Sequence, residues 1–394
     1  MRICRIYNNL SPNPEGFGIG LYELSLAQQK LGNDIYVINR TLSSKRIKNL
    51  KYNNISFNFI PFIPEFNVLN AFIPFGVLSF FRLNQLIKNK LIDLIHTHDI
   101  DTIYAIRRNK NVPLVTTFHV DKRVQMLRIS GKGFSFFTKI TENIGFQFNY
   151  LIWRKSNAII CISRQTMHRL INNYRVPSSK IYYIPNGVNI KRFNPTINSS
   201  DLKSSLKIDQ NYPIILFVGQ IYLLKGLKEL IIAISKIKKS YPRVFLLIIG
   251  SIKDRRYFKT IKSLIKKNKL VENVKFLEKI PYSLMPRFYR AADIFILPSY
   301  SEGMPKVLLE AMASRLCVIT TNLEGNKDLI KNNINGIYIE PKNTSDISNN
   351  LLKVLQDKKF KEKLALNAWK TAQEYDWFNI AQKIQEVYEI VLKR

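Results

Sequence analysis

Short apolar runs rich in β-branched residues recur along the whole chain and constrain its fold more than any other feature. They include IYVIN at residues 35–39, PLVTTFH at 113–119, IILFVGQ at 214–220 and CVITT at 317–321. Stretches of helical period, such as LYELSLAQQKLG and LKELIIAISKIKKS, separate several of these runs. Alternating strands and helices predict parallel sheets covered by helices, and continuous apolar character predicts strands buried on both faces. The predicted fold class is therefore α/β.

A polar break divides this pattern in two. Residues 194–213, NPTINSSDLKSSLKIDQNYP, lack an apolar period, and the strand–helix pattern restarts at Ile214. A chain of 394 residues has room for two cores. We therefore expect two doubly wound, Rossmann-like domains that join near residue 200.

The charge balance is strongly basic, with 61 Lys and Arg against 28 Asp and Glu. Residues 143–200 contain eight basic side chains and no acidic one. A surface this one-sided favours an anionic partner, although coding bias in an Asn-, Ile- and Lys-rich sequence is an alternative explanation. Charge is the sole argument for a nucleic-acid binder, because no zinc finger or related signature accompanies it. We therefore expect no nucleic-acid partner.

The cysteines and the N-terminus indicate a cytoplasmic protein. Three isolated cysteines without a CxxC pair suit a reducing compartment, and MRICRIYNN does not have the pattern of a secretory signal. The stretch from Ile55 to Phe81 carries one charge, but we expect its prolines, Pro74 among them, to prevent a membrane-spanning helix.

Ligands of open α/β sheets bind beyond the carboxyl ends of the strands, so these ends hold the candidate site residues. Gly16, Gly18 and Gly20 follow the first predicted strand, and we expect them in a loop where backbone amides approach a phosphate or sugar. A plain turn is the alternative interpretation. His119 ends the TTFH strand and is the histidine best placed to face a cleft, although a structural histidine at a strand end would have the same pattern.

The HTHD segment is the one place where a metal site suggests itself. We expect His96 and His98 to point to opposite faces of their strand, so that they could not ligate one ion together. No metal site is therefore predicted.

Two loops in the second half carry charged residues beside predicted helix starts. In FVGQIYLLKG, a strand ends at Gly219 and Lys225 directly precedes a helix that begins at Gly226 or Leu227. A lysine in this position can neutralise a diphosphate that also contacts the helix amides.

The second loop is PSYSEGMPKVLLEAMA, in which Pro305 fits the first turn of a helix. Glu302 then lies in the loop, and Glu310 lies about 7–8 Å along the helix. The amides near Lys306 would form an anion site, and ribose hydroxyls would satisfy a Glu310 carboxylate that is costly to bury alone. This row of groups matches a nucleotide sugar. The alternative is that Glu302 caps the helix and that Glu310 is solvated or salt-bridged.

The motifs and their order resemble the retaining GT-B glycosyltransferases of family 4, also called glycosyl transferases group 1. AIICISRQT, IPNGVNIKRF, FVGQIYLLKG, PSYSEGMPKVLLEAMA and NGIYIEP follow one another as they do in that family, and the E-x7-E element from Glu302 to Glu310 is the most specific of them. The resemblance implies an acceptor-side domain at 1–197 and a nucleotide-sugar domain at 198–372 that face one another across a cleft. It also implies a helix at 373–394 that crosses back to the first domain.

The resemblance further implies catalytic roles for Glu302, Lys225 and His119. Glu302 would contact the hydroxyls of the transferred sugar, Glu310 the ribose and Lys225 the diphosphate, with His119 close to the sugar. The implied binding set for the sugar nucleotide is Gly18, Gly219, Gln220, Lys225, Glu302, Gly303, Met304, Lys306, Val307 and Glu310.

The implied reaction is the retaining, metal-independent transfer of a hexosyl group from a UDP- or GDP-sugar, without a cofactor. The acceptor would be a glycan or a lipid-linked sugar in cell-surface polysaccharide or glycolipid synthesis. The basic N-terminal domain, with residues 134–157, is expected to touch an anionic membrane surface on the inner face, although an ordinary helical insert is the alternative. Gln220 stands where the family usually has arginine, which leaves a catalytically degenerate partner subunit as the alternative function.

Overall fold

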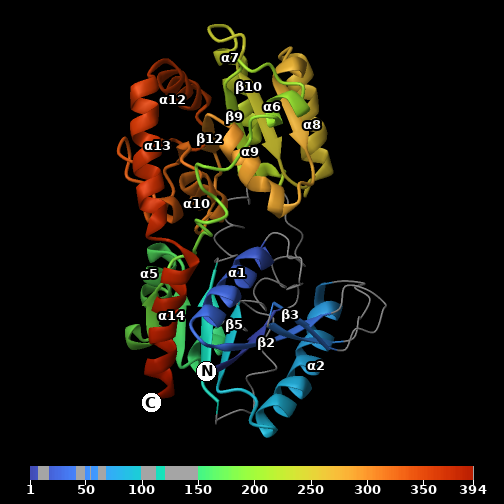
Figure 1. The fold of residues 1–394 in the computed structure, drawn as a ribbon, viewed down its shortest axis with the longest axis vertical. Coiled ribbons are helices and arrows are strands. Elements are labelled where there is room, and N and C mark those ends of the chain that lie inside the picture. The colour runs from blue at the N-terminus through green and yellow to red at the C-terminus, as the bar shows by residue number, and fades with distance from the viewer. Residues whose placement is uncertain are drawn as a thin grey trace. The chain divides into compact units, whose positions relative to one another are not determined.

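The computed structural model describes residues 1–7, 17–40, 49–53, 55–60, 68–98, 112–119 and 150–393. The chain forms two compact units, Met1–Gly187 with Trp377–Arg394, and Val188–Asp376 (Figure 1). The second unit thus begins ten residues before the boundary expected from the polar break. The reason is Phe193, which is fully buried and packs its ring against Tyr282 and Tyr289 of the second unit.

The first unit is built on an eight-stranded sheet in the order β3-β4-β2-β1-β5-β6-β7-β8. All neighbouring pairs are parallel except β3 with β4. The strands are β1 (Arg2–Ile6), β2 (Asp34–Arg40), β3 (Asn49–Tyr52), β4 (Ile55–Ile60), β5 (Leu94–His98), β6 (Leu114–Phe118), β7 (Ala158–Cys161) and β8 (Ile181–Tyr183). The strand order reverses between β1 and β5, which makes the carboxyl ends of these strands a topological switch point.

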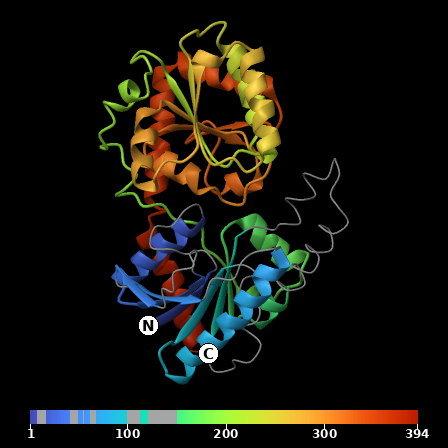
Figure 2. The ribbon, with the colours of Figure 1, turned by 90° about the vertical axis from the view of Figure 1, so that its right-hand side faces the viewer.

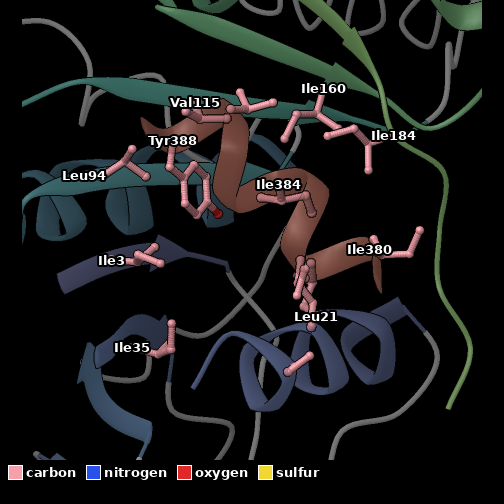
Figure 3. Packing of buried hydrophobic residues seen from close by; sticks show 14 of the residues in the cluster. Ile3, Leu21, Ile35, Leu94, Val115, Ile160, Ile184, Ile380, Ile384 and Tyr388 are labelled. Carbon is pink, nitrogen blue, oxygen red and sulfur yellow. The ribbon is translucent and has the colours of Figure 1, made fainter. Parts of the chain in front are cut away.

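Helices cover both faces of this sheet. They are α1 (Phe17–Lys30), α2 (Val68–Lys88), α5 (Arg164–Asn172) and α14 (Trp377–Leu392). On one face, Ile3, Leu94 and Val115 gather around Ile384 of α14, which also packs against α1 (Figure 3). The alternate residues of β1, such as Cys4, point to the other face, where α2 packs. The last helix therefore contributes to the core of the first unit.

The helix α2 corrects the expectation that Pro74 would break a helix in the apolar stretch after Ile55. It runs without a break through Pro74, its seventh residue. A proline there removes one backbone hydrogen bond, and packing of the rest of the helix against β2 and β4 offsets the loss. Among the described residues, no helix combines the length and the apolar character needed to cross a membrane.

The second unit contains a six-stranded parallel sheet in the order β11-β10-β9-β12-β13-β14. Its strands are β9 (Ile214–Val218), β10 (Phe245–Ile249), β11 (Val274–Leu277), β12 (Ile294–Leu297), β13 (Cys317–Thr321) and β14 (Ile337–Ile339). This is the doubly wound dinucleotide-binding order, which reverses between β9 and β12. Helices lie on both sides of the strands (Figure 2).

The helices of the second unit alternate with the strands from β9 to β14, whereas α6 precedes β9 and two helices follow β14. They are α6 (Leu202–Ser205), α7 (Leu227–Ile237), α8 (Arg255–Lys267), α9 (Met285–Ala291), α10 (Lys306–Ala313), α11 (Glu324–Lys327), α12 (Thr344–Gln356) and α13 (Lys358–Gln373). The α12 helix packs on α7, and α13 packs on α10. The predicted α/β class with two doubly wound units is confirmed.

Candidate functional site

The candidate site of the second unit lies where its strand order reverses, on the loops after β9 and β12. These loops are fixed to one another by the backbone. The Tyr300 amide donates to the Leu224 carbonyl at 2.7 Å. Gly226 has φ +66°, and a Cβ there would lie 2.0 Å from the Pro298 carbonyl oxygen. A left-handed glycine is therefore required at the point where the two loops touch.

An ion pair joins the two loops at their tips. Lys225 Nζ lies 2.5 Å from Glu302 Oε1, and the two side chains are 15% and 10% exposed. Burial lowers the pKa of Lys225, but the charge of Glu302 outweighs this effect and leaves the pKa raised. The two residues predicted to act on the diphosphate and on the sugar are thus in direct contact.

The backbone around Glu302 is held by a second close approach. A Cβ at Gly325 would lie 2.1 Å from the Gly303 carbonyl oxygen and 2.6 Å from that of Glu302. The Thr321 hydroxyl donates to the Ser299 carbonyl at 2.7 Å. The carboxyl end of β13 and the start of α11 therefore fix the position of the Glu302 loop.

The helix α10 begins close to its predicted start, with Pro305 as the residue before its first turn. The Leu308 amide donates to the Pro305 carbonyl at 3.1 Å, so it is used within the helix. The anion site expected near Lys306 therefore has fewer backbone amides than predicted, because the Leu308 amide is already hydrogen-bonded within the helix. Lys306 and Val307 are half-buried in the first turn.

Glu310 is buried in α10, as predicted, and two tyrosines satisfy its carboxylate. The Tyr282 hydroxyl donates to Oε1 at 3.0 Å, and the Tyr289 hydroxyl donates to Oε2 at 2.8 Å. Burial and then the charge of Glu310 raise the pKa of Tyr289 well above its usual range. Each carboxylate oxygen has two acceptor sites, so hydrogen bonds to tyrosine are compatible with hydrogen bonds to a ribose.

Sequence reasoning missed these tyrosines. They lie on a 3-10 turn (Tyr282–Leu284) and on α9, and the segment before residue 198 supports them. Phe193 contacts both rings at centroid distances of 5.6 and 5.5 Å, and the Arg192 guanidinium lies 5.3 Å from the Tyr282 ring. The sequence did contain one signal for them, because the carboxylate of a buried Glu310 requires hydrogen-bond donors from another element.

The loop after β9 also packs tightly against the end of β10. A Cβ at Gly250 would lie 1.8 Å from the Gly219 carbonyl oxygen, and Ile221 forms a bridge with Ile252. Gln220 is exposed at this edge. Lys253, which was not predicted, places Nζ 4.6 Å from the Tyr222 ring beside the same loop. A second cation is therefore available beside the loop that carries Gln220.

The remaining predicted residues belong to the first unit or complete the loops. Met304 is buried in the Glu302 loop. Gly18 is buried in the first turn of α1 and not in a loop, because the helix begins at Phe17. Gly16 lies outside the described residues. His119 directly follows β6 and is 5% exposed.

The expectation for the HTHD segment is wrong. His96 and His98 lie on the same face of β5, with ring centroids 4.4 Å apart. The reason is the strand period, since side chains two residues apart point to one face. Even so, no group of three or more His, Cys, Asp or Glu side chains in the described part of the chain is placed to hold a metal ion.

The histidines join a buried polar cluster at the carboxyl edge of the first sheet. Arg5 of β1 is fully buried, and its guanidinium contacts His96, His98 and Gln28 of α1. Tyr388 of α14 also contacts His96. Burial, together with the neighbouring Arg5 charge, lowers the pKa values of His96 and His98 well below their usual range.

Two family models match almost the whole chain. The model for Glycosyltransferase Family 4 matches residues 14–192, and the model for Glycosyl transferases group 1 matches residues 198–371. An uncharacterized glycosyltransferase of Methanocaldococcus jannaschii is 29% identical over 308 residues, which are 76% of each chain.

Two further proteins illustrate the range of the relatives. The UDP-Gal:alpha-D-GlcNAc-diphosphoundecaprenol alpha-1,3-galactosyltransferase of Escherichia coli is 28% identical over 71% of this chain and 70% of its own. The structure of sucrose-phosphate synthase from Thermosynechococcus elongatus superposes with a TM-score of 0.85 at 21% identity, covering 100% of this chain and 99% of that one. The two matched models, the fold and the relatives together establish that this chain is a GT-B glycosyltransferase of group 1 and family 4.

Proposed function

We propose that the protein transfers a hexosyl group, with retention of its anomeric configuration, from a nucleotide sugar to a lipid-linked or glycan acceptor. The observation that carries this proposal is the contact between Lys225 and Glu302 at the switch point of the second sheet. A fixed cation and a carboxylate there suit a diphosphate and the hydroxyls of the adjoining sugar. Glu310, held by Tyr282 and Tyr289 about one turn into α10, would accept hydrogen bonds from the ribose hydroxyls.

In the proposed step, the bond between the anomeric carbon and the diphosphate oxygen breaks, and the electron pair passes to that oxygen. The acceptor hydroxyl oxygen bonds to the anomeric carbon from the same face, and its proton passes to the departing diphosphate. Lys225 and the first-turn amides of α10 stabilise the growing negative charge. Lys253 supplies a second cation near Gln220, and we propose that the reaction needs no divalent metal.

A diphosphate-linked lipid is the acceptor to test first, because the E. coli relative is named for such a substrate. Arg154 and Lys155 are exposed and follow Leu151, which is 47% exposed, by three and four residues in one helical segment of the first unit. Basic side chains around an apolar one favour binding to an anionic lipid surface. We propose that the protein works at such a surface in polysaccharide or glycolipid synthesis, on the cytoplasmic side.

A thermal-shift screen with UDP, GDP, ADP and their common sugars, with EDTA present, tests the proposal. We expect one nucleotide family to raise the melting temperature, and the matching sugar nucleotide to be consumed when a diphosphate-linked lipid acceptor is added. Proton NMR of the product would then give its anomeric configuration. An inverted product would refute retention, and a requirement for added metal would refute metal independence.

The same screen separates this enzyme from a non-catalytic partner subunit. A shift without turnover on any acceptor would favour the partner subunit, since binding would then be retained without chemistry. A folded sample that binds none of these nucleotides would contradict the enzyme and would also favour the partner subunit, with the missing arginine at Gln220 as the disabling change.

A further inference from the structure

Arg5 is fully buried, and its contacts bear on which ring nitrogen carries the hydrogen in His96, His98 and His119. Its guanidinium contacts neutral groups, namely the Gln28 amide oxygen, His98 Nε2 at 2.9 Å and His96 Nδ1 at 3.4 Å. No carboxylate of the described residues forms an ion pair with it. An arginine carries donors and no acceptor, so each nitrogen or oxygen that faces it must accept.

This requirement passes from Arg5 to His98 and then to His119. Because Nε2 of His98 accepts from Arg5, the single hydrogen of the neutral ring is on Nδ1. That nitrogen lies 3.1 Å from His119 Nε2, which must therefore accept. The hydrogen of His119 is consequently on its Nδ1.

The same rule gives the opposite result for His96. Its Nδ1 faces Arg5 and lies 2.5 Å from the Tyr388 hydroxyl, while Gln28 Nε2 donates to that hydroxyl at 3.1 Å. Nδ1 therefore accepts, and the hydrogen is on Nε2, 2.7 Å from the Thr117 hydroxyl. Two neighbouring histidines on one strand face thus hold opposite tautomers.

We infer that Arg5 and His98 are positioning residues that hold His119 as a neutral ring with its hydrogen on Nδ1. In this state the hydrogen of His119 is on Nδ1 and its Nε2 is engaged by His98, so His119 does not serve as a general base. A second proton on His119 would set its Nε2 hydrogen against the Nδ1 hydrogen of His98. His119 would thus offer its N–H to a hydroxyl oxygen of a substrate at the carboxyl edge of the first sheet, a role that rests on the proposed function.

The cluster lies in the right place for such a role. Arg5, His98 and His119 are at the carboxyl ends of β1, β5 and β6, and the strand order reverses between the first two. Ligands of doubly wound sheets bind beyond such a reversal. Tyr388 ties the cluster to α14, where it points into the space between that helix and the sheet (Figure 3).

Long-range proton–nitrogen correlation NMR on protein labelled with ¹⁵N-histidine tests the inference directly. The chain has four histidines, and the exposed His168 serves as the reference. We expect a pyrrole-type Nδ1 in His98 and His119 and a pyrrole-type Nε2 in His96. A pyrrole-type Nε2 in His98 or His119 would overturn the inference, whether or not the protein transfers sugar.

Two substitutions at residue 98 then test the relay itself. His98→Gln provides an amide that can accept from Arg5 and donate to His119, so we expect the His119 signal to be kept. His98→Leu can do neither, and we expect the His119 tautomer to become mixed and kcat to fall by up to about 100-fold with little change in KM for the sugar nucleotide. An unchanged His119 signal in His98→Leu would refute the relay. If His98→Leu does not fold, the His119 signals of the wild type and of His98→Gln still show whether the hydrogen of His119 is on Nδ1.

Tyr388→Phe is the matched control, because it removes a hydroxyl from the same cluster on the His96 branch. We expect it to alter the His96 signal and to leave those of His98 and His119 in place. A change in all three signals would show that the cluster responds as a whole, which would contradict a directed relay. Wild-type protein without transferase activity but with the expected tautomers would refute the proposed function and not the relay.

Discussion

The contact between Lys225 and Glu302 should make a large, measurable contribution to stability. The pair is 2.5 Å apart and its side chains are 15% and 10% exposed, so removal of one partner leaves the other charge poorly solvated. Loss of one partner from a fully buried pair costs about 3–5 kcal/mol. Because some water reaches this pair, we expect Lys225→Met to lower the free energy of unfolding by about 2–3 kcal/mol.

The double variant provides the decisive comparison. In Lys225→Met combined with Glu302→Gln no charge remains at the site, so we expect a cost close to that of either single variant alone. The coupling energy of the cycle should be about 2 kcal/mol, within the range for residues in contact. Turnover of a single Lys225 variant would therefore mix instability with lost chemistry, so the stability of each variant has to be measured together with its turnover.

Urea unfolding followed by circular dichroism and tryptophan fluorescence gives these values. Both residues belong to the second unit, so the change should occur in the transition that Trp369 of α13 reports. The control is the same cycle on Lys358 and Glu362, an ion pair at 4.0 Å whose side chains are 84% and 61% exposed. Such surface pairs contribute about 0–1 kcal/mol. Additive losses at Lys225 and Glu302, or a coupling energy no larger than the control, would refute the reasoning.

Three further predictions concern the carboxylates and the histidines. Tyr289→Phe should lower the free energy of unfolding by about 1–3 kcal/mol, because a buried oxygen of Glu310 loses its hydrogen-bond donor. Urea unfolding measures this change, and an unchanged free energy would contradict the role of Tyr289 as that donor. Glu310→Gln should weaken UDP binding in calorimetry, whereas Glu302→Gln should mainly lower kcat; equal losses of UDP affinity would refute this division. The lowered pKa values of His96 and His98 mean that the unfolded chain binds protons that the folded chain does not. The stability that these two neutral rings contribute is present above about pH 6.5 and is lost as the pH falls below it. The free energy of unfolding should then decrease by up to about 2.7 kcal/mol per pH unit for the two groups. A free energy of unfolding that does not change between about pH 7 and 5.5 would contradict this prediction.

Features set by local rules could be predicted from the sequence. Buried parallel strands need continuous apolar runs, so the runs gave the fold class, and their carboxyl ends gave the loops of Lys225 and Glu302. The shared face of His96 and His98 also follows from the strand period, and the sequence alone was sufficient to predict it. The start of α1 at Phe17 was obscured by its glycines, which are poor helix formers but are tolerated in a first turn.

Features set by tertiary contacts could not be predicted in this way. The donors to Glu310 come from a turn and a helix that lie 28 and 21 residues earlier in the chain, respectively. The domain boundary depends on where Phe193 packs, and the polar composition of its neighbours carries no information on that. The hydrogen-bond partners of the buried Arg5 lie on two other elements, β5 and α1, that are far from it in the sequence, so the fold had to be known before they could be found.

The two sheets each place one poorly exposed cation near the point where their strand order reverses, and the partners of these cations set their different chemistry. Arg5 faces neutral acceptors, so its charge is retained and orders the hydrogens of its neighbours. Lys225 faces Glu302, which cancels most of its field, so it cannot attract a distant nucleotide. We therefore propose that attraction comes from the large excess of exposed cations, Lys253 among them, and that Lys225 acts when a diphosphate competes with Glu302 at contact distance. In an enzyme arranged in this way, the association rate constant of the nucleotide should increase at low salt. The contact at Lys225 is shielded from solvent, so its strength should depend much less on salt.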